Sequence, residues 1–150
     1  MKKISIKLNG ETRYVYVEPN DILLSVIRDK LGIKSPKSGC ERGDCGACEV
    51  FLNGKSVKSC LILAIEVDGQ EITTIEGLAE NGLTPLQESF IKNNSFQCGF
   101  CASGVTIAAT ELLNHNPKPT KEEIQEAIAG NLCRCTGYDS IIKGVQDLTE

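Results

Sequence analysis

The sequence predicts an α+β fold in which a small mixed β-sheet packed on one helix precedes a bundle of helices. Alternating apolar segments occupy the first half, and apolar residues at helical spacing occupy the second. The charge also divides, because residues 1–75 carry 11 basic and 10 acidic side chains and residues 76–150 carry 5 and 10. The eight cysteines split evenly between the halves. We therefore expect two units, residues 1–76 and 77–150.

The first unit begins with a β-hairpin. Apolar and polar residues alternate over 4–8, Asn9-Gly10 is a strong hairpin signal, and 13–17 form the returning strand. A helix is expected next, with Asn20 or Asp21 as its cap and Gly32 at its end. Its apolar face consists of Leu23, Leu24, Ile27 and Leu31.

A long loop and a second hairpin complete the first unit. Residues 35–48 hold three glycines and show no periodic pattern, which predicts a loop. Residues 49–52 and 56–60 flank Asn53-Gly54 and are expected to pair as strands. Residues 71–75 supply a last short strand, and residues 76–84 are expected to be a linker.

The second unit is predicted to be a bundle of four short helices. Thr120-Lys-Glu-Glu123 is a capping box, and Gly130 is a C-terminal stop signal for the helix that the box opens. The four helices are expected over residues 85–93, 104–114, 121–129 and 141–148.

Composition excludes several classes of protein. Aromatic residues make up 5% of the chain, Trp is absent and the net charge is −4, which argues against nucleic-acid binding. The N-terminal apolar pattern ends at Asn9-Gly10, before a signal peptide could form, and the longest apolar run, 61–65, is too short to span a bilayer. We therefore expect a cytoplasmic protein without a membrane span, whose reduced thiols are metal ligands or redox groups.

Four cysteines of the first half have a spacing that indicates an iron–sulfur cluster. The pattern is Cys40-x4-Cys45-x2-Cys48, and eleven residues separate Cys48 from Cys60 on a predicted strand. This is the spacing of plant-type [2Fe–2S] ferredoxins. Thiolates are soft ligands that suit such clusters, and loop glycines allow backbone N–H groups to turn toward the sulfurs.

The second set of cysteines is less diagnostic. It reads Cys98-x2-Cys101 and, after thirty-one residues, Cys133-x-Cys135. Residues i and i+2 point to different sides of a helix, so Cys133 and Cys135 are expected on an irregular turn. Cys101 precedes a predicted helix, whose N-terminal dipole would favour an anionic cluster. A second cluster site is the expectation, with structural zinc as its rival.

Other cysteine chemistries fit the spacings less well. Structural zinc prefers paired C-x2-C motifs, and joining Cys45/Cys48 to Cys98/Cys101 would leave four other thiols without a role. Rieske ligation needs two histidines where the chain has only His115, and the C-x2-C-x2-C-x3-C run of bacterial ferredoxins is absent. Cysteines that are simply buried, or that form disulfide bonds, remain as the alternative to a metal site.

Three motifs together resemble the small iron–sulfur subunit of the molybdenum hydroxylases, the xanthine dehydrogenase and aldehyde oxidoreductase family. The resemblance covers residues 3–148, and all eight ligand positions occur in the expected order. The motifs are Cys40-Glu-Arg-Gly-Asp-Cys-Gly-Ala-Cys48, Gln97-Cys-Gly-Phe-Cys101 and Gly130-Asn-Leu-Cys-Arg-Cys-Thr-Gly-Tyr138.

The resemblance implies a β-grasp, plant-type ferredoxin domain over 1–76 followed by a four-helix-bundle domain over 77–150, each with a [2Fe–2S] cluster. It implies ligation by Cys40, Cys45, Cys48 and Cys60 in one domain and by Cys98, Cys101, Cys133 and Cys135 in the other. It also implies that Gln97 and Cys135 contact a molybdopterin held mainly by a large partner subunit, while a medium-sized partner binds FAD.

The function implied is electron transfer within an oxidoreductase. Electrons would pass from molybdenum through Cys98/Cys101/Cys133/Cys135 and then Cys40/Cys45/Cys48/Cys60 to FAD. The sequence shows no catalytic base, Walker loop or GxGxxG motif, so no catalytic residue is assigned to this chain. A free two-cluster ferredoxin and a zinc-stapled interaction module are the alternatives.

Overall fold

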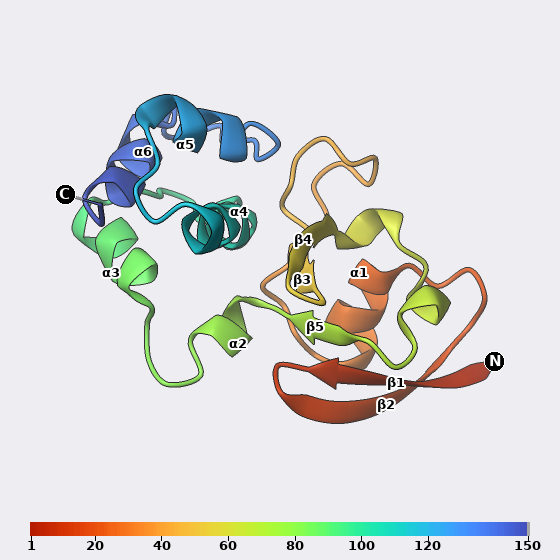
Figure 1. Ribbon diagram of the computed structural model, residues 1–150. Coiled ribbons are helices and arrows are strands. Elements are labelled where there is room, and N and C mark those ends of the chain that lie inside the picture. The colour runs from red at the N-terminus through yellow and green to blue at the C-terminus, as the bar shows by residue number, and fades with distance from the viewer. Residues whose placement is uncertain (150) are drawn as a thin grey trace.

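The computed structural model describes residues 1–149 and contains one five-stranded mixed sheet (Figure 1). The strand order is β2-β1-β5-β3-β4, with β1 parallel to β5 and the other neighbours antiparallel. The prediction of an α+β fold is confirmed. The strands are β1 (Lys2–Leu8), β2 (Glu11–Val17), β3 (Glu49–Leu52), β4 (Lys55–Lys58) and β5 (Glu71–Thr73).

The helix packed on the sheet changes its winding partway along. A single α-helical turn, α1 (Leu23–Ser25), continues as a π-helical turn, η1 (Val26–Lys30), because the Leu31 N–H donates to the Val26 carbonyl at 3.0 Å. The wider turn stacks Leu31 over Val26, and both side chains enter the core. The predicted cap, Asn20 or Asp21, is wrong, because Ile22 precedes α1 and makes no side-chain capping hydrogen bond. The Asp21 carboxylate instead accepts hydrogen bonds from the Glu18 N–H and from Lys30.

The second hairpin is shorter than predicted. Asn53 and Gly54 both have positive φ, as the Asn-Gly turn signal requires. Strand β4 ends at Lys58, so the prediction that Cys60 lies on this strand is wrong. The Ser59 hydroxyl donates to the Cys48 carbonyl at 2.6 Å, and the chain turns into a 3₁₀ helix, η2 (Ser59–Leu61). A second 3₁₀ helix, η3 (Ala64–Val67), precedes β5.

The predicted linker contains a helix. Helix α2 (Ile75–Leu78) follows β5 directly, where residues 76–84 were expected to be irregular. The Asn9 side chain fixes this junction, because its amide donates to the Thr74 hydroxyl at 2.9 Å and its carbonyl accepts from the Thr74 N–H at 2.8 Å. A distant hairpin residue therefore defines the start of α2, which local pattern could not show.

The remaining helices surround a second hydrophobic core. The Thr120 capping box is present as predicted, with a second box at Thr84. The helix boundaries differ from the prediction by one to two residues. Cys101 and Tyr138 precede α4 and α6 without making a side-chain capping hydrogen bond. The helices are α3 (Pro85–Lys92), α4 (Ala102–His115), α5 (Lys121–Ala127) and α6 (Asp139–Gln146). Within residues 1–149, no helix combines the length and apolar character that a membrane crossing needs.

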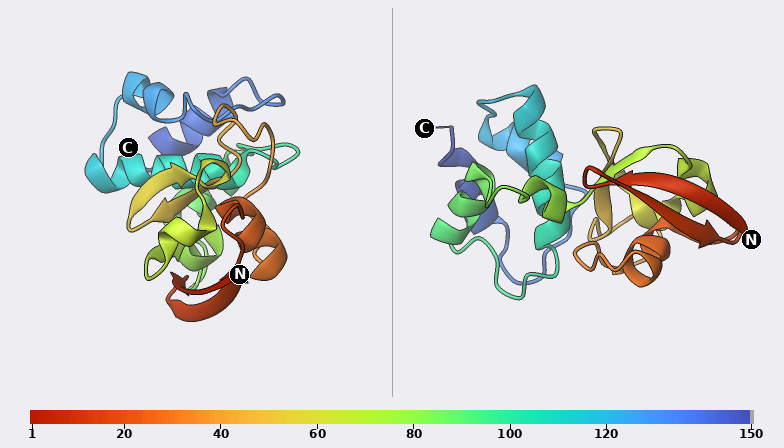
Figure 2. Two further views of the ribbon diagram at one scale, coloured as in Figure 1. Left: turned by 90° about the vertical axis from the view of Figure 1, so that its right-hand side faces the viewer. Right: turned by 90° about the horizontal axis from the view of Figure 1, so that it is seen from below.

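Helix α4 lies along the boundary between the sheet and the other helices (Figures 1 and 2). Its residue Gly104 lies directly on the main chain of Gly46, in the long loop before β3. A Cβ at Gly104 would overlap the Gly46 carbonyl oxygen, and a Cβ at Gly46 would overlap the Gly130 carbonyl oxygen. Because Gly46 and Gly104 have no side chains, the main chain at Gly46 can contact the main chains at Gly104 and Gly130 at this boundary.

Replacing Gly104 with alanine tests this contact. Alanine is favoured over glycine in a helix interior by about 1 kcal/mol, so Gly104→Ala would stabilise an unobstructed helix. Because the added methyl group overlaps a main-chain oxygen, we expect the free energy of unfolding to fall instead by about 1–3 kcal/mol. Thermal unfolding followed by circular dichroism measures the change.

Thr110→Ala is the matched control, because Thr110 lies on the same helix and is only partly buried. We expect this variant to unfold within a degree or two of the wild type. A Gly104→Ala protein that is as stable as the wild type, or more stable, would contradict the close backbone contact.

Candidate metal centres

The first cysteine set lies on a loop whose backbone turns toward one sulfur. Glu41, Gly43 and Gly46 have positive φ, and this winding directs successive N–H groups inward. The Cys40 sulfur accepts hydrogen bonds from the N–H groups of Arg42, Asp44 and Cys45 at 3.3–3.4 Å. These bonds, with that of Arg42 the largest, lower the pKa of Cys40 to about 6. The loop therefore favours a thiolate at Cys40.

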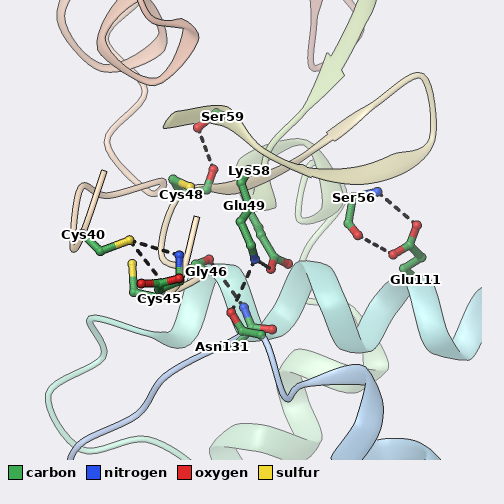
Figure 3. Close-up of polar contacts among 12 residues, drawn as sticks. Cys40, Cys45, Gly46, Cys48, Glu49, Ser56, Lys58, Ser59, Glu111 and Asn131 are labelled. Atoms are coloured by element: carbon green, nitrogen blue, oxygen red, sulfur yellow. Dashed lines mark hydrogen bonds and ion pairs between the residues drawn. The ribbon is translucent and has the colours of Figure 1, made fainter. Parts of the chain in front are cut away.

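The other thiols of this set form a buried pair. Cys48 and Cys60 are both buried and pack in one cluster, while the Cys45 N–H donates to the Cys40 sulfur. Burial raises the pKa of Cys48 to about 11. A free thiolate is unfavourable there, and a metal ion would remove that penalty by coordinating the sulfur. By burial, the four cysteines thus divide into an outer pair, Cys40 and Cys45, which Figure 3 labels, and an inner pair, Cys48 and Cys60.

The second set also divides into an exposed pair and a more buried pair. The Cys98 and Cys135 sulfurs are 3.6 Å apart and both residues are exposed. Cys101 is buried at the N-terminus of α4, and Cys133 packs against the same hydrophobic core. Burial raises the pKa of Cys101 to about 12, whereas the Phe100 N–H is the main cause that lowers the pKa of Cys98.

Cys133 and Cys135 lie on an irregular turn, as predicted, and two neighbouring hydroxyl groups shape it. The Thr136 hydroxyl lies 3.2 Å from the Cys133 sulfur. Burial is the largest single effect on Cys133 and opposes its ionisation, but the hydrogen bonds around its sulfur, those of Thr136 foremost, together lower the pKa. The Tyr138 hydroxyl accepts from the Cys133 N–H and donates to the Asn131 carbonyl, both at 2.9 Å. The turn is thus closed by side chains rather than by a helix.

Gln97 lies next to the second cysteine set, on its exposed side. Its side-chain amide donates to the Cys135 carbonyl at 3.2 Å. The two residues that sequence reasoning assigned to a pterin contact are therefore adjacent in the structure, although 38 positions apart in the chain. Their exposed side is open to a molecule approaching from outside.

The paired arrangement fits a two-iron cluster better than a single metal ion. Over residues 1–149, no three His, Cys, Asp or Glu side chains gather closely enough to hold one ion. A tetrahedral zinc site needs four such groups around one atom, whereas a [2Fe–2S] cluster takes four cysteines distributed over two irons. All eight cysteines are free thiols. The donor set and its N–H cradle therefore suit [2Fe–2S] clusters.

Polar residues between the two sites were missed by the sequence analysis. Glu49 is buried and pairs with Lys58 at 3.0 Å; burial raises the pKa of Glu49, and Lys58 opposes the rise. Asn131, also buried, donates to the Gly46 carbonyl at 3.4 Å. The position of Asn131 inside the third cysteine motif was its only sequence signal, because its partners lie on another segment.

Comparison with known families shows two iron–sulfur domains. The family described as "2Fe-2S iron-sulfur cluster binding domain" matches residues 6–79, and the "[2Fe-2S] binding domain" family matches residues 74–146. The small subunit of nicotine 6-hydroxylase from Paenarthrobacter nicotinovorans is 47% identical over 97% of this chain and 88% of its own. The small FeS subunit of nicotinate dehydrogenase from Eubacterium barkeri is 46% identical over 98% and 94%.

Solved structures give the same assignment. Quinoline 2-oxidoreductase from Pseudomonas putida 86 aligns with a TM-score of 0.95 at 42% identity, over 97% of this chain and 91% of that chain. Aldehyde oxidoreductase from Desulfovibrio desulfuricans aligns with a TM-score of 0.94 at 39% identity, over 99% of this chain but 17% of that chain.

The fold and the matched families define an iron–sulfur protein of the [2Fe–2S] class. The chain belongs to the family of small iron–sulfur subunits of the molybdenum hydroxylases, the xanthine dehydrogenase and aldehyde oxidoreductase family. Members of this family are subunits of oxidoreductases, as the sequence analysis predicted for this protein.

Removing the Tyr138 hydroxyl tests how the second cysteine turn is held. Tyr138→Phe deletes two hydrogen bonds, to the Cys133 N–H and the Asn131 carbonyl. We expect the free energy of unfolding to fall by about 1–3 kcal/mol for the two bonds together. Tyr16→Phe, on the exposed face of strand β2, is the control and should leave stability unchanged. Equal unfolding midpoints for both variants would rule out this role of the hydroxyl.

Proposed function

We propose that the chain holds two [2Fe–2S] clusters and transfers electrons within a molybdenum hydroxylase. The observation that carries the proposal is that the cysteines of each set lie in pairs, joined by a sulfur contact, by a main-chain hydrogen bond to sulfur or by packing in one core. Each pair would hold one iron. The pairs are Cys40 with Cys45 and Cys48 with Cys60 in the first site, and Cys98 with Cys135 and Cys101 with Cys133 in the second.

The residues around each quartet support one-electron chemistry, which the clusters supply when bound. The N–H groups of Arg42, Asp44 and Cys45 stabilise negative charge at the Cys40 sulfur. The Phe100 N–H, 3.5 Å from the Cys98 sulfur, has the same effect in the second site. Hydrogen bonds and burial of this kind set the reduction potential of an iron–sulfur centre.

We further propose that residues 1–76 form a β-grasp, plant-type ferredoxin domain and residues 77–150 a four-helix-bundle domain. A mixed sheet with one helix across it supports the first assignment. A separate core formed by α3, α4, α5 and α6 supports the second. The division between the two cores falls near α2 (Ile75–Leu78).

The partners proposed are a large molybdopterin-binding subunit and an FAD-binding subunit. Relatives that this chain covers over 88% and 94% of their length are named as small subunits, which implies larger companions. Gln97 and Cys135 on the exposed side of the second site would contact the pterin, so electrons would enter there and leave through the Cys40–Cys60 site toward FAD. Full-length relatedness to small subunits favours this assembly over a free ferredoxin. The eight cysteines form no disulfide bond, which supports a cytoplasmic setting.

Metal analysis of the tagged chain, purified without oxygen from its host, tests the proposal. We expect about four irons per chain, because each of the two sets of four thiolates matches one two-iron cluster. We also expect molybdenum and larger subunits to co-purify. Iron without molybdenum or a partner would favour a free electron carrier. Zinc in place of iron would overturn the proposal.

Single cysteine variants test the assignment of two independent sites. We expect Cys48→Ala to remove only the cluster of the first site and Cys101→Ala only that of the second, each with loss of one of two EPR signals. Ser38→Ala, on the same loop as Cys40 but without a thiol, should retain both signals. Loss of both signals from either single cysteine change would contradict two independent quartets.

Gln97→Ala tests the proposed pterin contact. The change removes an exposed amide beside Cys135 and leaves every thiol in place. We expect the purified enzyme to keep its iron and to lose molybdenum. Gln125→Ala removes an exposed amide from α5 and serves as the control. Unchanged molybdenum content in Gln97→Ala would count against the contact.

A further inference from the structure

A three-residue segment, Gly130 to Leu132, connects the two cysteine sites by direct contacts. The Gly130 carbonyl accepts from Lys58 at 3.4 Å, and the Leu132 N–H donates to the Cys45 carbonyl at 2.9 Å. Asn131, between them, donates to the Gly46 carbonyl. Leu132 immediately precedes Cys133, so one main-chain hydrogen bond joins Cys45 of the first site to the neighbour of a cysteine in the second.

Asn131 stands at the centre of this segment. It is 1% exposed, and its side chain lies beside Gly46 of the first site's loop and near the ends of Glu49 and Lys58 (Figure 3). Its main-chain carbonyl accepts from the Tyr138 hydroxyl, which also holds the Cys133 N–H. One residue therefore contacts the first site with its side chain and the turn of the second with its backbone.

Charge and shape hold the segment in a single register. Lys58 is anchored by its ion pair with buried Glu49 and so presents its ammonium group to Gly130. Gly46 has no room for a side chain, because a Cβ there would overlap both the Gly130 carbonyl and the Asn131 amide. A sliding movement of either loop would break these contacts together.

We infer that Asn131 is a positioning residue for electron transfer between the two sites. Its amide keeps the Cys45–Gly46 backbone in register with residues 130–133, which preserves the Cys45–Leu132 hydrogen bond. Electron transfer and magnetic interaction between two centres both weaken steeply as the centres separate. The inference rests on the proposed function, because it requires a cluster in each quartet.

The test uses the full chain, loaded with iron and purified without oxygen. Asn131→Ala is compared with the wild type by low-temperature EPR of the fully reduced protein, where two nearby paramagnetic clusters split each other's signals. We expect the wild type to show the splitting. We expect Asn131→Ala to keep its iron and both cluster signals and to lose the splitting.

Ser56→Ala is the matched control at the same boundary. The Ser56 hydroxyl and N–H both contact the Glu111 carboxylate on α4, which joins the two halves without touching a cysteine loop (Figure 3). We expect this variant to keep the splitting even where its unfolding midpoint falls. If Asn131 served only the stability of the boundary, both variants would behave alike.

Asn131→Asp supplies a second variant of the same size, with an oxygen in place of the donating amide. If the alanine variant does not accumulate, the EPR spectrum of Asn131→Asp tests the inference in its place. We expect Asn131→Asp to lose the splitting too. Splitting that is retained in an iron-loaded Asn131 variant, or that is absent from an iron-loaded wild type, would overturn this inference and leave the proposed function intact. A wild type without iron would instead overturn the proposed function.

Discussion

Contact between three backbones, at Gly46, Gly104 and Gly130, is the constraint on which the arrangement of the two sites depends. The loop of the first site, the helix that begins at Cys101 and the segment before Cys133 meet there without intervening side chains. Polar groups then complete the boundary, because main-chain oxygens brought this close to a buried surface need donors. Lys58 and Asn131 provide donors, and buried Glu49 balances the charge of Lys58.

The thiols experience two opposing effects, and the balance between them differs from cysteine to cysteine. Backbone N–H groups favour the thiolate at Cys40 and Cys98, whereas burial disfavours it at Cys48 and Cys101. Each set therefore contains one cysteine whose thiolate the backbone stabilises, Cys40 or Cys98, and one whose thiolate burial disfavours, Cys48 or Cys101. The more exposed cysteines would hold a cluster on the surface side of each site, and the more buried cysteines would hold it on the side of the protein interior.

Local pattern predicted the elements well and their junctions poorly. The Asn-Gly turns, the Thr120 capping box and the irregular turn at Cys133 depend on neighbouring residues, and all are present. The π-turn, the 3₁₀ turn at Cys60 and helix α2 depend on contacts between distant residues. Spacing alone likewise located the cysteines, but their pairing and the role of Asn131 required the relative placement of three segments.

Under the proposed function, the exposure of the second site favours one direction for the electron route. Cys98 and Cys135 are exposed beside Gln97, whereas Cys133 follows the segment that contacts the first site. One side of this quartet is thus open to an incoming partner, and the other is held by Asn131 and Leu132 against Cys45 and Gly46. Under the proposed function, an electron that enters on the exposed side would leave through the side of Cys133, which the Leu132–Cys45 hydrogen bond joins to the first site. The same backbone contact that closes the boundary therefore also joins the two sites in series.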